Sequence, residues 1–321
     1  MANQTEVSQA YNEVWQHAAK ARQNFWQRDG INVLEALKMD ERLVHYTSIS
    51  AALNIVQTKQ FWVSSTSRLR DISELNYGHY IRSLVFNGDD SKDLRKNNIF
   101  NICVARANEN MSSNESTSFI LSFSTEEPNT PDSLLHWNDF GDNKRGAAIV
   151  FKQDFLGRAT NSAIMSTNLC AIGKVEYDLE KQKIKWLDLF RFIHDNVAEL
   201  ENKYPHEIIA DVYSVVSTTL FSMINPFFKH PMLRKEREAR ALITVFENNY
   251  GSIHFREFGS QTIPYYPIWF DGVGAAQSEI EAIYLGPSYD EGLRLKLLGI
   301  LKRDALCRGV KVEFSGFPRH R

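Results

Sequence analysis

The chain has 321 residues, of which 43% are hydrophobic and 12% aromatic, so it can bury a large core without metals or disulfides. Its formal net charge of -2 excludes the overall basic excess that attracts proteins to nucleic acid or anionic lipid. The three cysteines are far apart and lack metal-ligand spacing, which predicts neither a disulfide framework nor a metal site. No signal-like start and no apolar run of about 18 residues is present, so we expect a cytoplasmic protein without a membrane partner.

The N-terminal segment from Thr5 to about Asp29 has apolar residues at helical spacing, which predicts an amphipathic helix. We interpret residues 1–40 as a helical brace. Two domains are compatible with the length, but no Pro-, Gly- or Ser-rich linker divides the chain. We therefore favour one α+β domain at residues 41–321.

Residues 43–74 are the most informative stretch, with the sequence LVHYTSISAALNIVQTKQFWVSSTSRLRDISE. A short apolar strand ends in His45, Tyr46 and Thr47, and Ser48 or Ser50 then caps a helix. A second strand follows and ends at residues 64–66. The pattern delivers polar side chains from the ends of two neighbouring strands, so function is sought there first.

The rest of the chain alternates between helical and strand patterns. Helices are expected at residues 72–86 and 92–106, strands at 117–124, 147–151 and 169–177, a short helix from residue 134, and a helical pair at 180–203 and 207–223. We interpret the pair as a helical insertion at about 179–225. From residue 236 onward four further strands are expected, then a helix at 291–307 and a strand at 310–314.

A second polar constellation lies in the segment KHPMLRKEREARALI. If a strand begins near Glu236, its period of two places Glu236, Glu238 and Arg240 on one face. A guanidinium beside two carboxylates can hold one of them ionised for catalysis. The alternative is a solvated, charged edge strand or a helix end with ion pairs.

Several segments resemble a widespread, poorly characterised bacterial domain family. They are HYTSISAALNIVQTKQFWVSS, residues 71–74, LLHWNDFGDNKRGAAIVF, KHPMLRKEREARALI, IYLGP and VEFSGFPR. The likeness runs from about Leu43 to the C-terminus. The chain departs from the family pattern at the turn after the second strand, which lacks Asn and Pro, and at Phe140, where a Tyr is common.

That family is distantly similar to NAD-dependent ADP-ribosyltransferases, including enzymes that modify DNA. The resemblance implies a central mixed, mostly antiparallel split sheet, with NAD as substrate. It assigns the ribose contact to His45, with Tyr46 and Thr47 beside it, support of the nicotinamide side to Ser65 at the end of the second strand, and catalysis to Glu238 or Glu236. From charge we add Arg68 or Arg70 for the pyrophosphate, and Arg240 beside the carboxylates.

The chemistry suits these residue types, because a fixed carboxylate stabilises the positive charge that develops when the nicotinamide–ribose bond breaks. Tyr46 or Trp62 can stack on a flat ring. Each residue also has a structural alternative: His45 as a hydrogen-bonding core residue, residues 64–66 as turn formers, and Trp137 with Phe140 as packing anchors.

Three functional hypotheses follow. The first is an ADP-ribosyltransferase-like enzyme that modifies a nucleic acid or protein, as a toxin or phage-defence effector with an antitoxin or phage protein as partner. The second is a non-catalytic module that senses a nucleotide or a phage component. The third is a hydrolase or nuclease that uses Asp71, Glu74 and Glu238.

Overall fold

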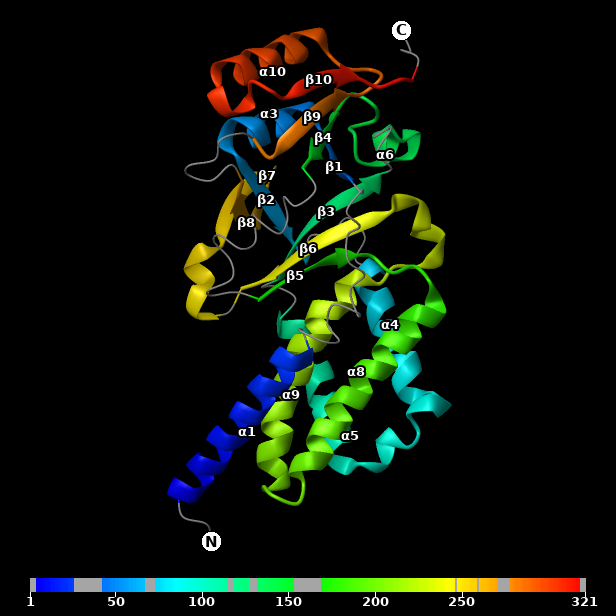
Figure 1. Ribbon diagram of the computed structural model, residues 1–321, viewed down its shortest axis with the longest axis vertical. Coiled ribbons are helices and arrows are strands. Elements are labelled where there is room, and N and C mark those ends of the chain that lie inside the picture. The colour runs from blue at the N-terminus through cyan, green and yellow to red at the C-terminus, as the bar shows by residue number, and fades with distance from the viewer. Residues whose placement is uncertain are drawn as a thin grey trace. The chain divides into compact units, whose positions relative to one another are not determined.

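The computed structural model describes residues 4–25, 42–66, 73–114, 118–126, 132–152, 169–245, 247–258, 260–270 and 278–317. The chain divides into two compact units (Figure 1). Unit 1 comprises Met1–Ala36, Leu69–Thr117 and Val175–Arg234, and unit 2 comprises Leu37–Arg68, Ser118–Lys174 and Lys235–Arg321.

Unit 1 is helical. Its elements are α1 (Gln4–Asn24), α4 (Ser73–Asn87), η3 (Asp89–Ser91), η4 (Leu94–Lys96), α5 (Asn98–Asn114), α8 (Leu179–Leu200), α9 (His206–Ile224) and η6 (Asn225–Phe227). Helix α9 contacts α1, α5 and α8, and α4 packs on α8 (Figure 1). The predicted N-terminal brace and the predicted helical insertion thus belong to the same unit.

Helix α9 is the most apolar helix of unit 1. The stretch His206–Phe227 is long and apolar enough to cross a membrane by length and composition, but 72% of its most apolar window is buried inside the protein. Its apolar residues line a core shared with the other helices of this unit. The apolar surface of α9 is therefore used for packing against the other helices of unit 1.

Unit 2 holds the sheet. Its strands are β1 (Arg42–Thr47), β2 (Gln60–Ser65), β3 (Ser118–Glu126), β4 (Ala147–Phe151), β5 (Leu169–Lys174), β6 (Glu238–Thr244), β7 (His254–Phe258), β8 (Gln261–Trp269), β9 (Ile280–Leu285) and β10 (Lys311–Phe314). Its helical segments are α3 (Ile49–Thr58), α6 (Leu134–Asp139), η8 (Glu247–Ser252), α10 (Glu291–Arg303) and η9 (Ala305–Cys307). A further 3-10 segment, η7 (Pro231–Glu236), leads into β6.

The strands follow the order β10-β9-β4-β1-β3-β2-β8-β7, with β6 pairing β3 and β5. Only β10 and β9 pair in parallel among the described strands. The predicted class, α+β with a mixed and mostly antiparallel sheet, is confirmed.

The sheet divides along one edge of β3. The C-terminal part of β3 pairs with β1, whose last pair here is Val44 with Ser124, and the N-terminal part pairs with β2, beginning at Ser64 with Ile120. The opposite edge of β3 pairs with the whole length of β6, from Ser118 to Ser124. Strands β1 and β2 thus both approach one edge of β3 and separate at Ser122.

The two faces of this sheet differ in chemistry. The apolar face carries the main core of unit 2, including Leu43, Phe61, Phe123 and Ala239, and is covered by α3 and α10. The opposite face carries a small cluster in which Trp137 of α6 packs on Val44 and Tyr46. Away from that cluster it bears polar residues of β3 and β6, so we call it the polar face.

Most predicted elements are found near their predicted positions. One difference is at residues 92–97, where a helix was expected and 3-10 structure is found before α5 begins at Asn98. The other is at Glu236, which lies in η7 rather than in a strand. Arg237 then has a φ of 45°, so the extended backbone starts only at Glu238.

Candidate functional site

His45 lies at the point where β1 and β2 separate. Its Nδ1 is 3.0 Å from the carbonyl oxygen of Ser122, and because a carbonyl only accepts, Nδ1 donates. Its ring packs edge-on against Phe61 and Phe123, at centroid distances of 5.2 and 5.8 Å. Burial lowers the pKa of His45, while the Ser122 carbonyl opposes the shift. The neutral imidazole therefore supplies a hydrogen bond that neither β1 nor β2 supplies at Ser122.

His45 and Glu238 point to opposite faces of the sheet. Paired residues of neighbouring strands share a face, and successive residues alternate. His45 contacts Phe123, which pairs with Ala239 on the apolar face, whereas Glu238 pairs with Ser124 on the polar face. The register therefore does not bring these two predicted site residues together.

Glu238 and Arg240 do come together, as their spacing predicted. Arg240 Nε donates to Glu238 Oε1 at 2.7 Å and its Nη2 donates to Oε2 at 2.9 Å. Glu238 is 8% exposed and Arg240 is 2% exposed, so this two-pronged ion pair is buried. Charge neutralisation within the pair is the condition for burying either group.

Glu236 does not share that face, which corrects the prediction of a strand from this position. The φ of 45° at Arg237 interrupts the alternation between Glu236 and Glu238. The Arg237 carbonyl instead accepts hydrogen bonds from the backbone N–H and the hydroxyl of Thr125, at 2.7 and 2.9 Å. The Glu236 carbonyl faces His136, whose Nε2 lies 3.0 Å away.

Tyr46 is held by packing rather than presented to solvent, whereas Thr47 is partly exposed. The Tyr46 ring stacks on His136 at 5.0 Å and meets Trp137 edge-on at 5.0 Å. Its hydroxyl accepts from the Ser133 backbone N–H at 3.3 Å. Thr47 pairs with Ala147 of β4. Tyr46 is 6% exposed, so stacking on a ligand ring would require it to leave His136.

The remaining predicted contacts fall in two groups. Ser65 is fully buried and pairs with Phe119 on the apolar face, so its neighbour Ser64 is the residue on the polar face. Arg68 lies outside the described residues, as do Arg70 and Asp71, and the side chain of Glu74 is likewise not described. Their roles in binding stay predictions.

An aromatic patch on β2, β8 and β7 was missed by the sequence argument, apart from Trp62. Trp62 and Tyr265 lie 4.9 Å apart at 30°, His254 lies 5.6 Å from Tyr265, and the Arg256 guanidinium lies 5.6 Å from the Trp62 ring. By register these four residues share the polar face with Ser64. The alternation in HFREF and TIPYYPIW carried the signal, but only strand pairing joins it to Trp62.

The patch is accessible to solvent. Trp62, Arg256 and Tyr265 are partly exposed and His254 is exposed, unlike the buried pair at Glu238 and Arg240. A partly exposed indole, a phenol and a guanidinium can contact a planar ring and an anionic group at the same time.

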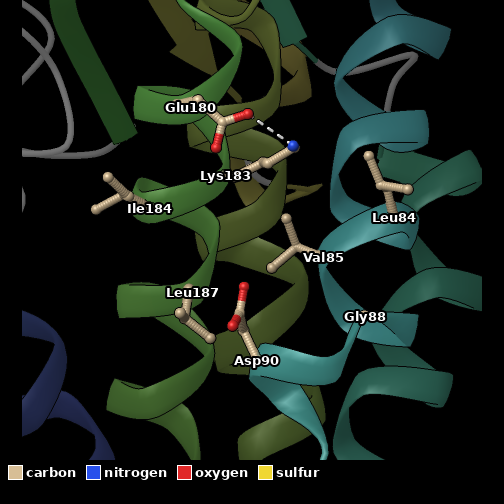
Figure 2. A pocket seen from close by; sticks show the side chains of 8 residues that line it. All are labelled: Leu84, Val85, Gly88, Asp90, Glu180, Lys183, Ile184 and Leu187. Carbon is tan, nitrogen blue, oxygen red and sulfur yellow. Dashed lines mark hydrogen bonds and ion pairs between the residues drawn. The ribbon is translucent and has the colours of Figure 1, made fainter.

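A pocket of about 250 Å³ lies in unit 1 between α4, η3 and α8 (Figure 2). The Glu180–Lys183 ion pair, at 2.8 Å, and Asp90 flank its aliphatic walls. The full lining is Leu84, Val85, Gly88, Asp90, Glu180, Lys183, Ile184 and Leu187. None of the predicted site residues is among them. Across the described residues, His, Cys, Asp and Glu form no group of three suited to a metal ion.

A comparison with family models matches the centre of the chain. A DUF2971 domain, described as a protein of unknown function, is found at residues 136–241. The match runs from His136 through α8 and α9 to Glu238 and Arg240, so it includes the buried pair and leaves out His45 and the aromatic patch. No curated protein and no solved structure matches the chain.

Proposed function

We propose that unit 2 is a nucleotide-binding module whose ligand lies on the aromatic patch. The observation that carries this proposal is the grouping of Trp62, Tyr265 and Arg256 on one accessible sheet face. Stacking accepts any nucleobase, and a guanidinium suits a phosphate. This is the second of the three hypotheses, at a site other than the one the sequence suggested.

Two features favour binding over catalysis at Glu238. Both of its carboxylate oxygens accept hydrogen bonds from Arg240, and the pair is buried. In addition, His45, to which the ribose contact was assigned, faces the opposite side of the sheet. A single ribose therefore cannot contact both side chains in this arrangement.

Calorimetric titration of the full chain with NAD, ATP and AMP tests the proposal. We expect at least one of them to bind, and Trp62→Leu to weaken it about tenfold or more, because a base–aromatic stack contributes about 1–3 kcal/mol. Arg256→Gln is expected to weaken the binding of ATP more than the binding of AMP, because ATP carries more phosphate charge. Trp15→Leu is the matched control, since Trp15 is 42% exposed on α1 of unit 1. Absence of binding, or equal affinity in Trp62→Leu, contradicts the proposal.

ADP-ribosyl transfer from NAD to a nucleic acid or protein is the second candidate, in the setting of a toxin or a phage-defence effector. It is supported by the division of the sheet at Ser122 and by a carboxylate at the first position of β6. The full chain is incubated with labelled NAD and mixed cellular DNA, RNA and protein. Release of nicotinamide with transfer of the label supports transfer, whereas bound NAD that stays intact supports the binding module.

A further inference from the structure

Three side chains in unit 2 meet at the junction of α3 and β2. Lys59 Nζ lies 2.7 Å from Cys307 Sγ and 2.8 Å from Asp304 Oδ2. The thiol in turn lies 3.6 Å from the same Asp304 oxygen. An amine, a thiol and a carboxylate thus share one small cluster.

The backbone fixes each member of this cluster. Lys59 ends α3 with a φ of 56°, and its N–H donates to the Ile55 carbonyl. Asp304 ends α10 and begins η9, where its side chain accepts from the Leu306 N–H at 2.9 Å. Cys307, at the end of η9, is 1% exposed. The contact is therefore built by two helix ends rather than by mobile surface residues.

The nitrogen–sulfur separation is short. A direct S–N bond would be shorter than the S–S bond of a disulfide, which is about 2.0 Å. Forming it would therefore require the Lys59 and Cys307 side chains to move closer together. One oxygen atom between nitrogen and sulfur spans the observed gap with little movement.

We propose that Lys59 and Cys307 form an oxidative modification site, at which dioxygen joins Nζ to Sγ through a single oxygen atom. An N–O bond and an S–O bond form, while the S–H bond, one N–H bond and the O–O bond break. The second oxygen atom leaves as water with those two hydrogens. Nitrogen and sulfur lose two electrons each, and dioxygen accepts all four.

Asp304 provides the proton acceptor for this reaction. The amine must lose a proton before nitrogen can form a bond, and the carboxylate lies within hydrogen-bond distance of it. The Lys59 and Asp304 side chains are 16% and 28% exposed, which gives a small oxidant access to a buried thiol.

The cross-link joins residues 248 positions apart. It connects the junction of α3 and β2 to the segment before β10. A covalent link of this span restricts the unfolded chain, as a disulfide does. We expect the oxidised protein to melt at a higher temperature than the reduced protein.

Intact-mass and peptide-mapping spectrometry of the full chain test the site after incubation in air or under anaerobic conditions. We expect the aerobic sample alone to contain a peptide pair joined at Lys59 and Cys307, with one oxygen gained and two hydrogens lost. Dithiothreitol should reverse the change and lower the melting temperature. Cys307→Ser and Lys59→Arg should abolish the linked pair. Cys103→Ser should retain it, since the Sγ of that buried cysteine contacts the Ala210 carbonyl instead.

Each other result overturns the proposal. A pair that has lost two hydrogens without gaining oxygen indicates a direct S–N bond. Oxygen on Cys307 without a link to Lys59 indicates ordinary thiol oxidation. Absence of any change in the aerobic wild type, whose folding is checked by circular dichroism, shows that the contact is only an ion pair beside a thiol.

Discussion

His45 donates from Nδ1 to the carbonyl of Ser122 at the one point where the paired edge of β3 passes from β1 to β2. Ser122 lies between Ser124, which pairs with Val44, and Ile120, which pairs with Ser64. A side chain thus takes the place of a ladder hydrogen bond. This contact gives His45 a structural role, which was the alternative to ligand binding.

Replacing His45 with leucine should therefore destabilise the fold. The change leaves the Ser122 carbonyl without its donor, and a buried polar group left unsatisfied costs about 1–3 kcal/mol. His45→Gln keeps an N–H donor and should lose less stability than His45→Leu. Urea denaturation measures both, with His206→Ala at an exposed position as control. A Leu variant as stable as the wild type would show that this hydrogen bond contributes nothing.

The stability of the wild type should fall on acidification because of His45. Burial lowers its pKa in the folded state, whereas the unfolded side chain titrates near about 6.5. Below that pH the unfolded chain binds a proton that the native chain does not, so the free energy of unfolding decreases until the native pKa is reached. Urea titrations in buffers that span this window should show a smaller decrease in His45→Gln. Parallel curves for the two proteins contradict the assignment.

The buried pair of Glu238 and Arg240 should behave as one unit. Glu238→Gln or Arg240→Met alone leaves a charge buried without its partner, and such changes cost about 3–5 kcal/mol. The double variant should cost less than the sum, with the difference measured in a double-mutant cycle. The exposed pair Glu180–Lys183 is the control, where coupling of about 0.3–0.5 kcal/mol is expected. Additive single effects at the buried pair would contradict this prediction.

Gly146 allows the close approach of β4 to the end of β1. A Cβ at this position would lie 2.1 Å from the Thr47 carbonyl oxygen and 2.8 Å from that of Gly141. Gly146→Ala must therefore displace backbone, and overpacking of this kind costs about 1–3 kcal/mol or more. Gly309→Ala is the matched control, because nothing lies within 4 Å of its added Cβ. Thermal melts of both variants check the difference, and equal melting temperatures would contradict it.

Asp132 connects α6 to the C-terminal segment. It accepts from Trp137 Nε1 at 2.6 Å, from the Ser315 hydroxyl at 2.8 Å and from the Gly316 N–H at 2.6 Å. Asp132→Ala should leave the buried indole N–H unsatisfied, at a cost of about 1–3 kcal/mol. Hydrogen exchange should then speed up at residues 315–317 but not in α9. Asp188→Ala, at an exposed ion pair on α8, should change neither the stability nor the exchange at residues 315–317.

Local patterns were sufficient to predict most elements. Alternating apolar residues identified the first two strands, and the side chain of Ser48 caps α3 by accepting from the Ala51 N–H at 3.2 Å. Spacing alone also predicted that Glu238 and Arg240 share a face. These features depend on residues that are close together in the sequence, so local sequence patterns are enough to predict them.

The predicted site required information that no local pattern carries. Whether His45 and Glu238 meet depends on the register of both strands against β3, which is set by residues far apart in the chain. The left-handed conformation of Arg237 also has no signature, because it is fixed by the contact of its carbonyl with Thr125. The aromatic patch was missed for the same reason, since Trp62 meets Tyr265 only through strand pairing.

The imidazole between β1 and β2 has one more consequence, which concerns what the protein does not bind. A strand edge with an open carbonyl invites an extended peptide to add to it. His45 donates to that carbonyl and packs edge-on against Phe61 and Phe123, so the carbonyl is already paired within the protein. The sheet can therefore remain divided at Ser122 without becoming a place where a second chain docks or aggregation begins.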